Sequence, residues 1–201
     1  MRWAWQALWG VFVRPAATLQ DFRKYDPESV ALLLCFTGPM IVLSVVAAGW
    51  AHSLTPDAFP PETRPQPVPF AIYSALTQLV GVLGLATAGH FLCDLFQGRS
   101  EFSRALAAVS VAMVPAWIGN VLAALPWPYG APLALAGIAY SLILLYAAFA
   151  LVLGMRRGNR LGHYAASLGA AALVVFAFGW QAVSLIPGAA PEVRLGTTWL
   201  I

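Results

Sequence analysis

Long stretches of this chain contain no Asp, Glu, Lys or Arg, and their lengths predict helices that cross a membrane. A spanning helix needs about 20 mostly apolar residues. The charge-free stretches cover residues 29–56, 65–93, 105–155 and 161–191. Three of them fit one helix each, and the stretch 105–155 is long enough for two. We therefore predict an all-α fold: a polytopic membrane protein with five transmembrane helices, at residues 30–50, 70–96, 105–125, 132–153 and 164–185.

The segment before the first span has helical periodicity but is too short to cross a bilayer. Tryptophan prefers the headgroup region, and an amphipathic helix rich in tryptophan can lie flat there. We therefore predict an N-terminal amphipathic interfacial helix, with Trp3, Trp5, Trp9 and Phe12 as membrane-interface anchors. The predicted domains are a cytoplasmic amphipathic segment (1–29), a five-helix transmembrane domain (30–185) and a short extracytoplasmic tail (186–201).

The loop charges predict how the protein is oriented in the membrane. Only Arg64 and Arg194 lie on the side of the first and third loops and the C-terminus. The other nine basic residues lie on the opposite side: Arg2, Arg14, Arg23, Lys24, Arg99, Arg104, Arg156, Arg157 and Arg160. Cytoplasmic loops carry the excess of Lys and Arg. We therefore expect a cytoplasmic N-terminus and a periplasmic or extracellular C-terminus, in the cytoplasmic (inner) membrane of a bacterium.

Composition supports the membrane assignment and narrows the possible partners. Of the 201 residues, 60% are hydrophobic and 9% are charged, whereas soluble domains are about 25% charged. The net charge of +3 is spread over loops, so no nucleic-acid partner is predicted. Cys35 and Cys93 lie near helix ends that face the reducing side, where free thiols are expected.

Small residues and prolines mark where the helices should pack and bend. Helices in lipid associate where small residues let their backbones approach closely. The candidate packing residues are Gly81, Gly84 and Ala88 on the second span, and Gly162, Ala166 and Ala170 on the fifth. They favour packing within the bundle, and a dimer interface is the alternative. Pro39 and Pro115 should kink the first and third spans.

A polar cluster at one end of the second span is the main candidate for chemistry. His90, Cys93 and Asp94 occur in GHFLCDLFQG, and His90 and Asp94 are one helical turn apart, so they can touch. The cluster could have a structural role, in which its side chains cap the helix or reach water at the interface. It could instead transfer a proton, or ligate a metal or a haem, and for haem His163 would be the second axial ligand. The spacing matches no standard zinc motif. We predict no metal and no cofactor apart from bound lipid.

Two amides in the spans form a second candidate. Gln78 and Asn120 lie near the same side of the membrane and could pair across helices, or contact a substrate. The chain has no HExxH, no Gly-x-Ser-x-Gly and no Gly-rich phosphate loop. No catalytic residue is therefore predicted.

Several short motifs occur in an order and spacing that resemble a known family. They are Phe12-Val13-Arg14-Pro15, Leu19-Gln20-Asp21-Phe22, Asp26-Pro27, His90, the turn from Phe96 to Phe102, Val114-Pro115, Tyr140-Ser141-Leu142, Leu144-Leu145-Tyr146 and Gly154-Met155. Over about 180 residues the chain resembles a bacterial member of the Yip domain family, whose eukaryotic relatives bind Rab-type GTPases and act in vesicle traffic. The resemblance implies a five-helix bundle with a cytoplasmic N-terminus, and no catalytic residues.

Three functions remain open at this point. The leading hypothesis is a non-enzymatic membrane protein that acts as a scaffold, an accessory subunit or a membrane-organising factor. The alternative is a small-molecule or proton-linked transporter that uses the kinked third span and the His90–Asp94 pair. The third is a membrane redox subunit or enzyme with a cofactor ligated by His90 and His163. The expected partners are membrane lipids and either a protein partner or further copies of the chain.

Overall fold

The structure is a computed structural model that describes residues 2–24, 28–54, 66–98, 101–126 and 128–188. Within these ranges it is helical and contains no strand. The helices are α1 (Arg2–Val13), α2 (Pro15–Lys24), α3 (Ser29–Leu32), α4 (Gly38–Leu54), α5 (Pro67–Leu95), α6 (Phe102–Ala112), α7 (Val114–Leu122), α8 (Gly130–Val152) and α9 (Arg160–Leu185). A π-helical turn (Leu33–Thr37) joins α3 to α4, and a 3-10 turn (Arg157–Asn159) precedes α9.

Five helical segments are long and apolar enough to cross a membrane, which confirms the predicted architecture. They are Ser29–Ala51, Pro67–Leu95, Phe102–Leu122, Gly130–Val152 and Arg157–Leu185. The last segment begins seven residues earlier than predicted, because the basic loop before it is already helical from Arg157. The C-terminal tail and most of the first loop lie outside the described residues.

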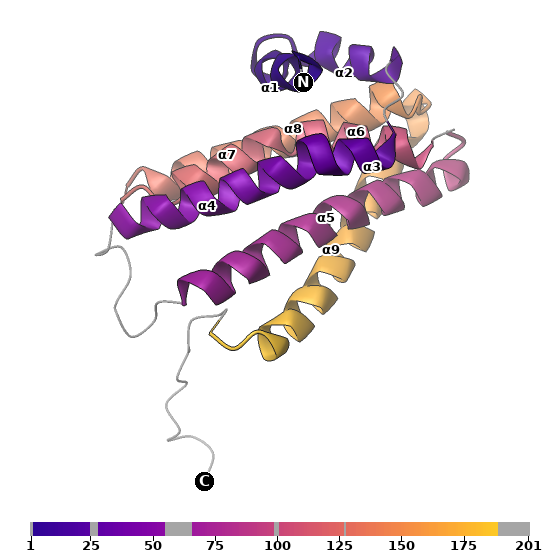
Figure 1. The fold of residues 1–201 in the computed structure, drawn as a ribbon. Coiled ribbons are helices and arrows are strands. Elements are labelled where there is room, and N and C mark those ends of the chain that lie inside the picture. Colours follow the sequence, from indigo (N-terminus) through magenta and orange to yellow (C-terminus); the bar gives the residue numbers. More distant parts are fainter. Residues whose placement is uncertain (1, 25–27, 55–65, 99–100, 127, 189–201) are drawn as a thin grey trace.

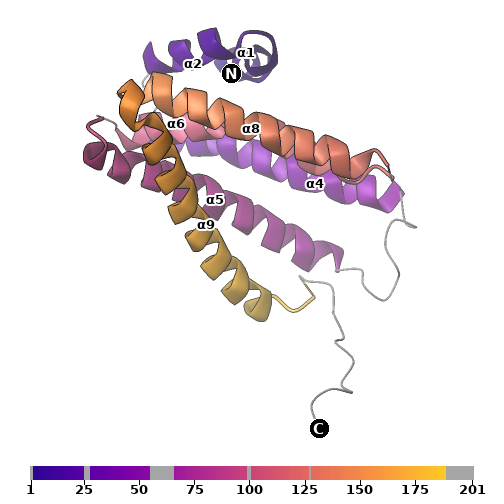
Figure 2. The same cartoon turned by 180° about the vertical axis from the view of Figure 1, so that it is seen from behind.

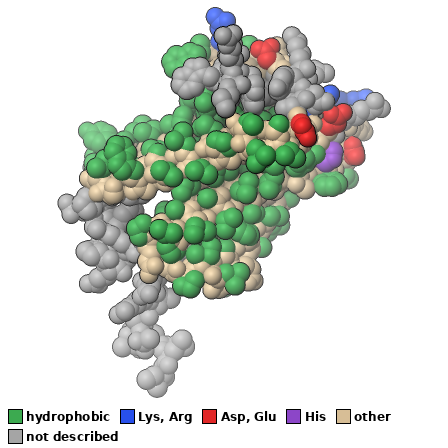
Figure 3. Space-filling model, viewed as in Figure 1, with side chains coloured by type: hydrophobic (Ala, Val, Ile, Leu, Met, Phe, Trp, Pro, Cys, Tyr) green, Lys and Arg blue, Asp and Glu red, His purple; other side chains and the backbone are tan. Residues whose placement is uncertain are grey.

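The two ends of the bundle differ in charge, and we name them accordingly. The basic end carries Arg104, Arg156, Arg157 and Arg160, where α6 and α9 begin and α8 ends. The turn end is opposite, where α7 turns into α8 and α5 begins. Figure 3 shows charged side chains around α1, α2 and the basic end, while the rest of this face is hydrophobic or uncharged. Towards the turn end, α5 and α9 diverge from α4 and α8 (Figures 1 and 2).

Helix α6 forms the centre of the bundle. Its residues from Ala105 to Ala112 are completely buried, between α5, α8, α3 and the N-terminal helices. Ser110 on α6 shares a hydrogen bond with Thr37 of the π-helical turn, with 2.8 Å between the hydroxyl oxygens. A buried hydroxyl needs such a partner, because an unpaired polar group in an apolar interior costs free energy.

Both prolines that were expected to kink a helix lie at interruptions of the helical ladder. The π-helical turn ends immediately before Gly38 and Pro39, and its wider backbone accommodates the proline. The third span breaks at Met113, between α6 and α7, just before Pro115. The backbone N–H of Ala116 then donates to the Ser141 hydroxyl of α8 at 2.8 Å. The Ser141 side chain thus provides a hydrogen-bond acceptor for a backbone N–H that lies beside the break between α6 and α7.

The N-terminal helices α1 and α2 pack against the bundle on α6 and α8 (Figure 1). Val11 and Leu19 are each only 1% exposed, and the Tyr140 hydroxyl of α8 donates to the Val11 carbonyl at 2.8 Å. The expected interface anchors Trp9 and Phe12 are both exposed, and the Phe12 ring also lies beside Tyr140. The side chains of Trp3 and Trp5 lie outside the described residues. The segment is helical, and the face that packs on the bundle includes Val11.

Candidate functional site

Helices α5 and α9 form a pair that is joined at both ends. At the turn end the Gln66 backbone N–H donates to the Gly188 carbonyl at 2.9 Å. Along the pair, Gly84 faces Val174 and Ala171 of α9, and Gly81 faces Val175. Ala88, Ala166 and Ala170 are half-buried on the same two helices. The candidate packing residues of the second span therefore lie against the fifth span.

His163 lies at the contact of this pair with α8, close to the basic end. Its side chain is completely buried, and its Nε2 is 2.9 Å from the Gly89 carbonyl of α5. Because a carbonyl only accepts, Nε2 carries the proton. The ring lies edge-on to Phe96 and Phe149, with centroid distances of 5.7 and 5.1 Å. His163 therefore holds three helices together.

Two unpaired polar atoms remain beside this contact. The Nδ1 of His163 and the hydroxyl of Ser167, one turn further along α9, are buried without a hydrogen-bond partner. Gly162, at the start of α9, lies against the Phe96 ring, where an added Cβ would come within 2.9 Å of the ring. Aromatic rings thus pack against one side of this end of α9.

Cys93 and Asp94 occupy different environments although they are neighbours. Cys93 is completely buried, and its thiol lies 3.6 Å from the Met155 sulfur. Gly98 fits against both sulfur atoms, where an added Cβ would overlap them. Asp94 is exposed. Both cysteines are free, and Cys35 is exposed on the first span.

His90 and Asp94 are spaced so that they can touch, but no hydrogen bond or ion pair joins them in the structure. The Nδ1 of His90 is buried and has no hydrogen-bond partner. Its ring instead lies beside Phe91 and Phe102, with centroid distances of 5.2 and 6.3 Å. The α5 group that accepts the hydrogen bond from His163 is the backbone carbonyl of Gly89. No group of three or more His, Cys, Asp or Glu residues within the described ranges could hold a metal ion.

A second candidate site lies at the other end of the pair, towards the turn end. A cleft of about 660 Å³ separates α5 and α9 from α7 and α8. Its wall is mostly apolar, and the exposed side chains of Phe70 and Ile138 lie at its rim. Five polar side chains also line it: Tyr73, Ser74, Thr77, Gln78 and Asn120.

Gln78 and Asn120 share this cleft but do not form the expected pair. The Gln78 carbonyl oxygen accepts from the Ser44 hydroxyl of α4, and its amide nitrogen donates to Ser74, both at 3.2 Å. The Asn120 side chain makes no hydrogen bond to any described residue, and the buried Thr77 hydroxyl has no partner either. The half-buried Asn120 amide is therefore available to a ligand in the cleft, whereas neighbouring atoms cover the Thr77 oxygen.

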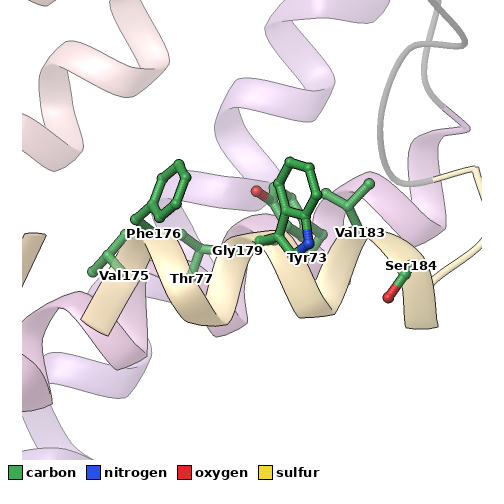
Figure 4. A pocket seen from close by; sticks show the side chains of 8 residues that line it. Tyr73, Thr77, Val175, Phe176, Gly179, Val183 and Ser184 are labelled. Atoms are coloured by element: carbon green, nitrogen blue, oxygen red, sulfur yellow. The ribbon is translucent and has the colours of Figure 1, made fainter. Parts of the chain in front are cut away.

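A second depression of about 580 Å³ lies along the outer edge of the pair (Figure 4). It is lined from α9 by Val175, Phe176, Gly179, Trp180, Val183 and Ser184, and from α5 by Tyr73 and Thr77. The rings of Phe176 and Trp180 lie 6.5 Å apart and are each more than 70% exposed. This aromatic edge of α9 faces away from the rest of the bundle.

Several residues that shape these sites give weak sequence signals. Four of them are isolated glycines: Gly89, Gly98, Gly119 and Gly137, the last two at the contact between α7 and α8. At Gly137 an added Cβ would lie 2.6 Å from the Pro115 carbonyl oxygen. The Tyr140 hydroxyl bonds to a residue 129 positions away. A glycine inside a span is the only signal that indicates such contacts in advance.

Five apolar spans, with α6 of the third span buried at their centre, define a polytopic helical membrane protein. The model of the Yip1 domain matches residues 9–179. The chain belongs to this family, which confirms the resemblance in its motifs. No curated protein and no solved structure matches the chain.

Proposed function

We propose that this protein is a non-enzymatic scaffold or accessory subunit that binds another membrane protein through the aromatic edge of α9. One observation carries the proposal: three polar side chains in the spans each form a hydrogen bond to the backbone of another helix. Tyr140 donates to the Val11 carbonyl, Tyr164 to the Leu142 carbonyl, and His163 to the Gly89 carbonyl. Interhelical hydrogen bonds of this kind stabilise helix packing in lipid. The bundle that these hydrogen bonds stabilise is suited to presenting an exposed surface to a protein partner.

The surface that we assign to the partner is the side of α9 that contains Phe176 and Trp180. Helix α9 packs mainly on α5 and meets α8 only near His163, so it lies at the edge of the bundle (Figure 2). Leu173, Phe176 and Trp180 are 71–73% exposed and lie about one turn apart. Large aromatic side chains contribute strongly to association because each buries a wide area.

Photocrosslinking in native membranes tests this assignment. A photoreactive phenylalanine analogue in place of Phe176 should crosslink to a second protein, and mass spectrometry would identify it. The matched control places the same analogue at Ile143 on α8, which is 63% exposed. The proposal would be refuted if the protein purified in mild detergent as a monomer with no other protein attached, and if the analogue at Phe176 gave no crosslinked adduct.

A further inference from the structure

We infer that the cleft between α5, α7, α8 and α9 binds one phospholipid, with an acyl chain along its apolar wall and the ester region at Asn120. The cleft shares Tyr73, Thr77 and Val175 with the depression at the α9 edge, but Phe176 and Trp180 do not line it. Either assignment can therefore fail without the other. The first argument is size. The cleft measures about 660 Å³, which lies within the range of about 300–1,000 Å³ for small-molecule sites.

Size also favours a thinner occupant than a transmembrane helix. A helix about 11 Å across occupies roughly 1,400 Å³ over half of a 30 Å bilayer, about twice the volume of the cleft. A flexible hydrocarbon chain is thinner and can follow an irregular wall. The wall suits such a chain because it is formed by side chains such as Val82, Leu85 and Leu168.

Depth in the membrane is the second argument. Helix α5 has 29 residues, so at about 1.5 Å per residue it is about 44 Å long and exceeds the roughly 30 Å hydrocarbon core. Tyr73 lies about 9 Å from its first residue. For a centred helix, this places Tyr73 close to the boundary of the hydrocarbon, where the ester groups of phospholipids lie. Asn120, two residues before the end of α7, is at the same end of the bundle.

Unused hydrogen-bonding capacity is the third argument. The Asn120 amide lies at the cleft without a partner among the described residues. It can donate a hydrogen bond, and ester carbonyls can accept one. A polar group in lipid that lacks a partner costs free energy, so a bound ester group would stabilise this side chain. An acyl chain alone would leave it unpaired.

The experiment uses purified full-length protein in phosphatidylcholine vesicles that contain a phosphatidylcholine with a diazirine on one acyl chain. After illumination, mass spectrometry should locate the label on peptides of α5 and α7. Ala172 lies at the edge of the cleft, and Ala172→Phe should reduce this labelling about tenfold by filling the space. Ala177 is exposed and lines neither depression, so Ala177→Phe should leave the labelling unchanged.

A second variant separates ester binding from loose contact with surrounding lipid. Asn120→Leu keeps the side-chain volume similar and removes the amide, so it should reduce labelling about fivefold. It should not reduce labelling by a diazirine alkane, which has no ester. Labelling spread evenly over all exposed helix faces, or equal in the Ala172→Phe variant and the original protein, would overturn the inference. So would crosslinks from the cleft to a second protein chain.

Discussion

The two ends of the α5–α9 pair use different side chains and pack in different ways. Towards the basic end, Gly89, Cys93 and His163 let the pair approach α8 closely, and Cys93 and His163 are completely buried. Towards the turn end, Thr77, Gln78 and Asn120 line an open cleft. Small and aromatic residues allow close packing, whereas polar groups require partners. The closed end therefore holds the bundle together, and the open end is free to bind a ligand.

The largest expected effect comes from filling the closed end. In Gly89→Leu, even the first added carbon would lie 3.0 Å from the Phe149 ring. The substitution should lower the free energy of unfolding by about 3 kcal/mol, because the helices must separate. Denaturant titration in mixed micelles measures this. Gly169→Leu is the matched control, since nothing lies within 4 Å of its added Cβ. Equal losses in the two variants would contradict close packing at Gly89.

Removing the imidazole of His163 should have the next largest effect. His163→Ala loses the hydrogen bond to Gly89 and leaves a cavity between two aromatic rings. The expected loss of stability is about 2–3 kcal/mol. His90→Ala serves as the comparison, because His90 is half-buried and has no bond at Nδ1. If the His90 variant is the less stable of the two, the structural role assigned to His163 is wrong.

Coupling energies from double-mutant cycles would compare the strength of a hydrogen bond in the buried core with that of a hydrogen bond beside the cleft. Thr37 and Ser110 are both completely buried and lie 2.8 Å apart, whereas Ser44 and Gln78 lie 3.2 Å apart beside the cleft. Double-mutant cycles with Thr37→Val and Ser110→Ala should give a coupling energy of about 1 kcal/mol, near the upper part of the range for membrane proteins. The cycle with Ser44→Ala and Gln78→Leu should give less. The reverse order would show that the cleft is the tighter region.

The smallest expected effect on stability is that of Asn120→Leu. Asn120 makes no hydrogen bond to another described residue, so its replacement should change the free energy of unfolding by less than about 0.5 kcal/mol. The same denaturant titration measures the change. A loss similar to that of His163→Ala would show that Asn120 holds the bundle together, and would count against its role in the cleft.

Much of the fold could be predicted from local sequence properties. Apolar runs of sufficient length located all five spans, because water is absent from the bilayer and each span must satisfy its own backbone. Pro39 and Pro115 marked two interruptions in the helices, since proline lacks a backbone donor. The family could be recognised because its motifs keep their order along the chain.

The candidate site was harder to predict. One-turn spacing suggested that His90 contacts Asp94, but the structure leaves His90 among aromatic rings and Asp94 exposed. A common position near one membrane face suggested that Gln78 pairs with Asn120, but Gln78 bonds to Ser44 and Ser74 instead. Helix spacing and depth specify which side chains can meet, whereas the rotation of each helix decides which do.

The sequence by itself determined the membrane as solvent, the number of spans, the positions of the breaks and the family. The first three follow from properties that act over one helix or less, and the family follows from the order of motifs along the chain. Only the tertiary structure decided that α6 is the centre, that Val11 meets Tyr140, and that His163 meets Gly89. It also decided that α5 and α9 leave a cleft at the turn end. These features depend on side chains far apart in the chain, because lipid favours all apolar helix faces almost equally and close packing selects among them.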